Sequence, residues 1–216
     1  MNRRPRQSVR TAAIAAACLA GIAVLAGCEP SAQDVRRQAV AVMNQGVKLA
    51  KQQKYQEAVG QLEEALRLDP GLAEAHYHLG SVHEALGEAT KAVEEYTEAI
   101  RIKPDYADAF NERANVYYAL GDLDRAIADF TAVVSLEPNA ADALYNRGCV
   151  HLQRGNVDMA IADLGEVIRI NPNDADAYRA RASAHQAKGD PPAAQADLAR
   201  AEELQAAAQS PTGNPP

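Results

Sequence analysis

Apolar residues recur through most of the chain at the spacing of one helix face. Phe110, Ala114 and Tyr117 are four and three residues apart, and Gly121-Asp122 then interrupts the pattern. The same spacing resumes at Ala126, Ile127, Phe130 and Val133. No run shows the alternation of apolar and polar residues that is typical of a strand. The pattern predicts a helix, a short turn and a second helix over 107–140, in an all-α chain.

This unit repeats with a period of 34 residues. Small residues recur at Gly46, Gly80, Ala114, Gly148 and Ala182, alanines at Ala58, Ala92, Ala126, Ala160 and Ala194, glycines at Gly87, Gly121, Gly155 and Gly189, and prolines at Pro70, Pro104, Pro138 and Pro172. A fixed period of this length indicates stacked helix pairs. We expect five repeats, near 39–72, 73–106, 107–140, 141–174 and 175–208.

Helix starts are predicted from capping residues. Ser31 with Asp34 has capping-box spacing, and Asp190 followed by Pro191 suits the start of the last helix. After the internal prolines, Gly71, Asp105, Asn139 and Asn173 are the expected caps, with Glu74, Asp108, Asp142 and Asp176 three residues later. We therefore assign these four acids to helix capping rather than to an acidic binding patch.

The first thirty residues follow another pattern. Four arginines before residue 11 precede an uncharged apolar run that ends at Leu25-Ala26-Gly27-Cys28. This layout is typical of a secretory signal, and the final four residues resemble the lipobox of bacterial lipoproteins. The resemblance implies a signal peptide over 1–27 and lipid (palmitate among the acyl chains) on Cys28, so that 28–38 comprises the lipidated tether and the start of the first helix. A transmembrane anchor and twin-arginine export are the alternatives.

The repeat columns resemble the tetratricopeptide repeat. The second repeat supplies His76, Leu79, Gly80, His83, Ala92, Tyr96, Ala99 and Pro104, and the third supplies Phe110, Ala114, Tyr117, Ala126, Phe130, Val133 and Pro138. The resemblance implies a right-handed α-solenoid of about five helix-turn-helix repeats over 39–208, followed by a disordered tail over 209–216. The first repeat matches least, since Gln53 stands where the family has glycine.

Charge and composition exclude several functions. The chain carries 22 basic and 29 acidic residues, and removal of the signal, which holds no acid, would make it more acidic. An acidic surface disfavours nucleic acid and anionic lipid. Cys149 would be the only cysteine left beside Cys28, so no internal disulfide is expected. No catalytic or nucleotide-binding motif is present, so we expect no enzyme activity and no cofactor.

Two side-chain columns invite a chemical interpretation. Arg113, Arg147 and Arg181 stand in first helices, and Asp129, Asp163 and Asp197 stand in the second helices of the same repeats. We predict buried pairs, with anion binding as the alternative. His83, His151 and His185 share one column, but neighbouring repeats lie about 10 Å apart, too far to share one zinc with bonds of about 2 Å. No metal site is predicted.

In the tetratricopeptide family, fixed positions of the first helices line a concave peptide-binding groove. Transferred to this chain, the resemblance selects Tyr77, Asn111, Asn115, Tyr118, Tyr145 and Arg179, with Ser81 and Glu84 at further groove positions. Asparagine can donate to and accept from a peptide backbone, and tyrosine is a common interface anchor. The alternative is an ordinary solvated surface. Asn111 and Asp176 replace lysines of the family's carboxylate clamp, so that clamp is not expected.

The sequence therefore predicts a protein-binding adaptor anchored in the bacterial cell envelope. Glu29 is not the aspartate that favours inner-membrane retention, so the outer membrane, facing the periplasm, is expected. The alternative is a structural assembly factor, similar to pilotins or pilus assembly lipoproteins, that self-associates. Its apolar face would comprise Val40, Met43 and Val47, unless these pack against the segment 31–38.

Overall fold

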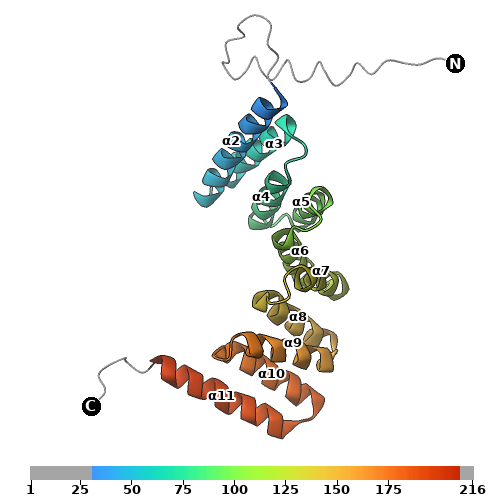
Figure 1. Ribbon diagram of the computed structural model, residues 1–216, viewed down its shortest axis with the longest axis vertical. Coiled ribbons are helices and arrows are strands. Elements are labelled where there is room, and N and C mark those ends of the chain that lie inside the picture. Colours follow the sequence, from blue (N-terminus) through green and yellow to red (C-terminus); the bar gives the residue numbers. More distant parts are fainter. Residues whose placement is uncertain (1–30, 210–216) are drawn as a thin grey trace, which may run out of the picture. The chain divides into compact units, whose positions relative to one another are not determined.

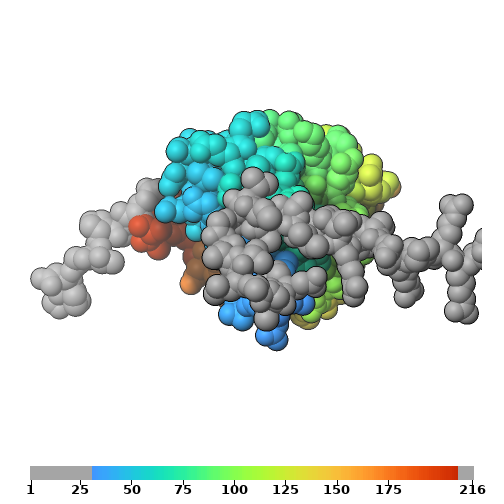
Figure 2. Space-filling model, turned by 90° about the horizontal axis from the view of Figure 1, so that it is seen from above, coloured from blue at the N-terminus to red at the C-terminus, as the bar shows by residue number. Residues whose placement is uncertain are grey.

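A computed structural model describes residues 31–209 (Figures 1 and 2, where the other residues are grey). The predicted signal peptide, Cys28 and most of the predicted tail lie outside this range. All regular structure within it is helical, which confirms the all-α prediction. The helices are α2 (Ala32–Lys51), α3 (Tyr55–Leu68), α4 (Ala73–Ala85), α5 (Ala89–Ile102), α6 (Ala107–Ala119), α7 (Leu123–Leu136), α8 (Ala141–Arg154), α9 (Val157–Ile170), α10 (Ala175–Lys188) and α11 (Pro191–Gln209).

The chain divides into two compact units between Leu79 and Gly80. Unit 1 contains the pair α2 and α3, whose core includes Ala39, Met43, Ala58 and Leu62. Ser31 forms the predicted capping box, because its hydroxyl accepts from the Asp34 amide at 3.2 Å and the Asp34 carboxylate accepts from the Ser31 amide at 3.3 Å. Residues 32–38 are therefore the first turns of α2 itself. The expectation that Val40, Met43 and Val47 pack against a separate preceding segment is wrong.

Unit 2 contains the helices from α5 to α11, in which each pair is packed on the next. One buried cluster combines Ala114 and Tyr117 of α6 with Phe130 and Val133 of α7 and Val150 of α8. The cluster therefore joins two repeats, as the small-residue and aromatic columns predict.

Glycines and prolines set the ends of the helices. The four turn glycines have φ between 75° and 87°, the left-handed region that suits glycine. Gln53 takes φ 60° at the equivalent turn, where its side chain makes that conformation less favourable. Glu137 precedes Pro138 and is extended, which ends α7 at Leu136.

The predicted caps after the internal prolines are wrong by one residue. The N-caps are Tyr106, Ala140 and Asp174, and of these only Asp174 caps with its side chain, which accepts from the amides of Asp176 and Ala177. Asp108 and Asp142 are consequently the second residues of α6 and α8, too early for a capping box. The structure removes the capping-box reason for treating these two carboxylates as structural, and leaves the weaker effect of the helix dipole on acids in the first turn.

The arginine and aspartate columns pair as predicted. Each arginine donates two hydrogen bonds of 2.7–2.8 Å to the carboxylate of the aspartate 16 residues later. The pairs are Arg113 with Asp129, Arg147 with Asp163, and Arg181 with Asp197. A third bond reaches the preceding repeat. Arg113 donates to Thr97 Oγ1 at 2.8 Å, and Arg147 donates to Thr131 Oγ1 at 3.2 Å. We call this set the arginine ladder; its bonds link α5 through α9 without a break, and its last pair joins α10 to α11.

The ladder is incomplete at its last step. The position equivalent to Thr97 and Thr131 is Gly165, and a Cβ built there would lie 3.7 Å from Arg181 Nη1. Both threonines also donate to the carbonyl four residues earlier, at 2.7 Å, which leaves their lone pairs free for arginine. A threonine at 165 has room to do the same.

We expect Gly165→Thr to raise the free energy of unfolding by about 1 kcal/mol, through the added hydrogen bond and the removal of a helical glycine. Gly165→Ala is the matched control, because it restores helix propensity without a hydroxyl. Urea unfolding should rank the proteins threonine, alanine, glycine, although threonine is the poorer helix former. If the alanine variant were more stable than the threonine variant, this account of the ladder would be contradicted.

Candidate functional site

The first helices of unit 2 present one row of polar and aromatic side chains. On α6, Asp108, Asn111, Asn115 and Tyr118 are three or four residues apart, so they share a helix face. The equivalent residues are Asp142, Tyr145 and Cys149 on α8 and Asp176 and Arg179 on α10, and Ser81 and Glu84 lie at the end of α4. We call this set, together with Glu112, the first-helix face. Five of the six predicted groove residues belong to it.

The α6 part of the face is organised by Glu112. The Asn111 amide donates to Glu112 Oε1 at 3.3 Å, and the Asn115 amide donates to Glu112 Oε2 at 3.2 Å. The carbonyl oxygens of both asparagines remain available as acceptors. Tyr118 is 43% exposed and offers its ring to solvent. Sequence reasoning missed Glu112, since it lies beside the family's groove positions rather than on one.

On α8 and α10, aromatic and charged groups are neighbours. Burial raises the pKa of Tyr145, and the nearby Cys149, Asp176 and Asp174 add to this increase. Burial likewise raises the pKa of the Cys149 thiol, which keeps it protonated. Arg179 donates to Asp176 at 2.7 Å and to Gln205 of α11 at 2.6 Å. The carboxylates at the start of α10, Asp174 and Asp176, thus lie close enough to Tyr145 of α8 to act on it across the repeat boundary.

Tyr77 lies in unit 1, on the first turns of α4, where its ring meets His78 edge-on at 5.2 Å. It therefore belongs to a different unit from the other predicted groove residues. The predicted self-association face also belongs to unit 1. Met43 is 8% exposed, while Val40 and Val47 are half-buried. This face consequently offers less free apolar surface than expected.

At the α4 end of the face, Tyr96 fixes Glu84. The Tyr96 hydroxyl lies 3.0 Å from Glu84 Oε2 and 3.2 Å from Ser81 Oγ, and the tyrosine is fully buried. Partial burial raises the pKa of Glu84, and repulsion from Glu112 adds to this, although the hydrogen bond from Tyr96 opposes it. Two acids from successive first helices thus act on each other. Tyr96 was predicted only as a packing residue.

The histidine column faces the interior. His151 is buried, with its Nδ1 3.3 Å from the Asn156 amide, and Nδ1 of His83 lies 2.7 Å from Glu88. Among residues 31–209, no three His, Cys, Asp or Glu side chains are grouped closely enough to hold a metal ion. The column therefore serves packing in this part of the chain.

We expect burial of His151 to make stability depend on pH. Burial lowers its pKa, with a further decrease from Arg147 and an opposing effect of Asp163. The unfolded chain, with an ordinary histidine pKa of about 6.5, then binds more protons below neutrality, so stability falls as pH falls through that value. His151→Tyr, which copies Tyr117, should reduce the loss in unfolding free energy between about pH 7.5 and 5.5. An equal loss in both proteins would contradict this role.

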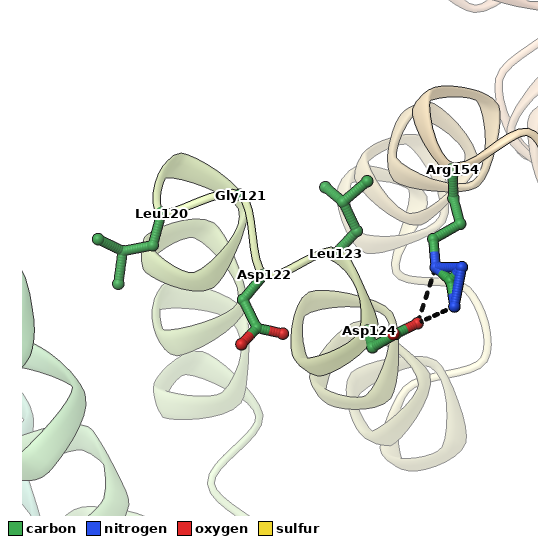
Figure 3. A pocket seen from close by; sticks show the side chains of 6 residues that line it. All are labelled: Leu120, Gly121, Asp122, Leu123, Asp124 and Arg154. Atoms are coloured by element: carbon green, nitrogen blue, oxygen red, sulfur yellow. Dashed lines mark hydrogen bonds and ion pairs between the residues drawn. The ribbon is translucent and has the colours of Figure 1, made fainter.

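The turns between paired helices carry a separate set of surface contacts. A shallow pocket is lined by Leu120, Gly121, Asp122, Leu123, Asp124 and Arg154. In Figure 3, the Arg154 side chain reaches Asp124, with Nε 2.8 Å from Oδ1. Lys188 pairs with Asp158 at 2.9 Å in the same way, one repeat later. Exposed pairs of this kind contribute about 0–1 kcal/mol, so we assign them to repeat stacking rather than to chemistry.

None of the helices between residues 31 and 209 is long and apolar enough to cross a membrane. The sequence model of the tetratricopeptide repeat matches residues 43–107 and 111–175, which is more than half of the chain. No curated protein sequence matches the chain.

Solved structures share the fold at low sequence identity. A crystal structure of MamA protein is 23% identical, and the match covers 82% of this chain and 98% of that one, with a TM-score of 0.75. MamA from Desulfovibrio magneticus RS-1 is 20% identical, with coverage of 80% and 97% and a TM-score of 0.74. YrrB, described as a TPR protein with an unusual peptide-binding site, is 23% identical, with coverage of 78% and 87% and a TM-score of 0.71. The chain belongs to the tetratricopeptide repeat family.

Proposed function

We propose that this chain is a non-catalytic adaptor of the bacterial envelope, which holds an extended segment of a protein partner on the first-helix face. The observation that carries the proposal is the contrast between columns. Core and ladder positions repeat from one helix pair to the next, whereas the first-helix face, apart from its aspartate column, changes at each step, for example from Ser81 to Asn115 to Cys149. A surface that varies on a constant scaffold is typical of a specific binding site in repeat proteins.

The side chains of this face suit recognition of an extended chain. Tyr118 and Tyr145 provide aromatic area with a polar end, and Asn111 and Asn115 keep free carbonyl oxygens for peptide amides. YrrB, whose fold is similar, is described as having a peptide-binding site, which supports the same use here.

Membrane anchoring is the second part of the proposal. Its support is the sequence Leu25-Ala26-Gly27-Cys28 after an uncharged run, with lipid on Cys28 and the outer membrane, facing the periplasm, as the location. Several acyl chains on one residue anchor stably, unlike a single chain. Metabolic labelling with a fatty acid analogue tests this part. Labelled, membrane-bound protein that persists in Cys28→Ala would refute it.

Photocrosslinking in intact cells tests the binding site. A photoreactive phenylalanine analogue at position 118 should capture a protein partner, whereas the same analogue at Leu198, an exposed residue of α11, should not. Asn115→Ala with Tyr145→Ala should abolish capture while circular dichroism remains unchanged. Equal capture at both positions, or unchanged capture in the double variant, would exclude the first-helix face.

Self-association through the first repeat remains the alternative function. It would depend on Val40, Met43 and Val47, of which Met43 is already buried within the chain. Sedimentation of the mature protein at high concentration tests it, and a monomer would count against it.

A further inference from the structure

The first-helix face is strongly acidic. Its charged residues are the five acids Glu84, Asp108, Glu112, Asp142 and Asp176 and the single cation Arg179. That cation is already held by Asp176 and Gln205. Asp108 and Asp142 are exposed, and among residues 31–209 neither forms an ion pair or a capping hydrogen bond. The face therefore carries uncompensated negative charge along three successive first helices.

Two of these acids are held in an unfavourable arrangement. The Tyr96 hydroxyl, fixed in the core, keeps Glu84 in place while the charge of Glu112 acts on it from the next first helix. Glu112 is in turn kept in place by two asparagine amides. Ionised Glu84 consequently costs free energy in the unliganded protein, and a bound cation would reverse that cost.

The surroundings of the acids favour a side-chain cation over a bare ion. Tyr145 lies close enough to Asp176 for the carboxylate to act on it, and Tyr118 is exposed on the same helix as Glu112. Aromatic rings attract Lys and Arg and pack against their aliphatic stems. The carbonyl oxygens of Asn111 and Asn115 can accept from the backbone of the same segment. If successive first helices are taken to have the spacing of packed helices, about 10 Å, one step corresponds to about three residues of an extended chain at about 3.3 Å each.

We propose that the partner segment is an extended basic peptide, with Lys or Arg at about every third residue, whose cations meet the carboxylates of successive first helices. This inference rests on the proposed function and specifies its partner. It also assigns Glu84 and Glu112 to binding, and it reinterprets Asp108 and Asp142 as groups that contact the partner.

Fluorescence anisotropy with three labelled peptides tests the proposal. They have Arg, Gln or Glu at every third position and are otherwise identical, with serine and glycine between. The Arg peptide should bind the mature domain, and raising the salt from about 50 to about 300 mM should weaken its binding. The Gln and Glu peptides should bind at least roughly tenfold more weakly.

Charge-matched variants separate the face from the general acidity of the protein. Glu84→Gln with Glu112→Gln should weaken the Arg peptide roughly tenfold, whereas Glu137→Gln with Glu202→Gln, which removes the same charge elsewhere, should change it less than about twofold. Glu84→Gln alone should raise the melting temperature, because it removes a destabilised charge. Equal binding of the three peptides, no binding of the Arg peptide, or equal effects of the two double variants would overturn the proposal.

The crosslinking experiment distinguishes this proposal from the broader one. If mass spectrometry maps the segment captured at position 118 to a stretch without basic residues, the basic-peptide inference fails and the adaptor function stands. If position 118 captures nothing beyond the control at Leu198, both fail. A captured segment with regularly spaced Lys or Arg supports both.

Discussion

Arg147→Ala should lower the free energy of unfolding by about 3 kcal/mol, the largest effect that we expect from a single polar substitution. The arginine holds Asp163 by two hydrogen bonds of 2.7 and 2.8 Å, and the two side chains are only 17% and 11% exposed. Removal of one partner of a buried pair leaves the other charged and unsolvated. For a domain of this size the melting temperature should fall by roughly 6–12 °C in circular dichroism.

Two controls define this result. Arg101→Ala removes an arginine that pairs with Glu98 on the exposed surface of α5, at 2.7 Å, and should cost less than about 0.5 kcal/mol. Arg147→Met with Asp163→Leu replaces both charges by apolar groups and should recover most of the loss. If Arg147→Ala were no worse than Arg101→Ala, the ladder would not stabilise the stack.

Gly80→Ala should destabilise the chain by about 1–2 kcal/mol, although alanine is the better helix former. A Cβ at this position would lie 2.7 Å from Cε1 and 2.8 Å from Cδ1 of Tyr96. The Tyr96 ring is fully buried and is fixed through its hydroxyl, so it cannot move aside without losing the bonds to Ser81 and Glu84. Chemical denaturation of the single variant measures the cost.

A second substitution tests the steric cause. Leucine would not relieve the clash, since a Cβ at Gly46 or Gly148 would lie 2.8 or 3.0 Å from Leu62 or Leu164, whereas Tyr96→Ala removes the ring. We expect Gly80→Ala to cost less in the Tyr96→Ala background than in the original chain, a positive coupling in a double-mutant cycle. Additive losses would show that the clash is not with the Tyr96 ring.

The helix pairs and the arginine–aspartate pairs could be predicted because the same residues recur in successive repeats, whereas the threonine links of the ladder were not predicted. A single arginine such as Arg147 does not indicate a buried pair. The pair is indicated because arginine occurs only in the repeats that have aspartate 16 residues later. The small-residue column was equally informative, because it marks positions with no room for a side chain. A Cβ added at Gly46 would lie 2.8 Å from Leu62 Cγ, and one added at Gly148 would lie 3.0 Å from Leu164 Cγ. Because equivalent contacts recur in successive repeats, one sequence contains several examples of the same contact.

Helix starts could not be predicted to the residue. Asp105 and Asn139 have good capping side chains, yet Tyr106 and Ala140 occupy the N-cap positions of α6 and α8. The carbonyls of Tyr106 and Ala140 accept the first helical bonds, from Phe110 and Leu144, at 3.2 and 3.0 Å. Tertiary packing sets these starts and overrides a side-chain preference of about 1 kcal/mol.

The binding chemistry of the face was only partly accessible from the sequence. The repeat positions were enough to identify Asn111 and Asn115 as groove residues. They could not predict that both asparagine amides donate to Glu112. That arrangement depends on side-chain rotamers within a single helix, and no other repeat reproduces it. The role of Tyr96 was hidden for a similar reason, since its hydroxyl reaches residues of the preceding helix rather than its own column.

The arginine ladder also bears on how such a chain can change length. Each complete step joins a threonine of one repeat to an arginine and an aspartate of the next. A repeat that carries this threonine can therefore be followed by any repeat that carries this arginine. Deletion of residues 141–174 would bring Thr131 into the place of Gly165 opposite Arg181, whereas duplication of residues 107–140 would place Thr131 of the first copy opposite Arg113 of the second and add an equivalent step. A gain or loss of 34 residues in this region can therefore occur without new interface chemistry, and the partner-binding face would lengthen or shorten one helix at a time.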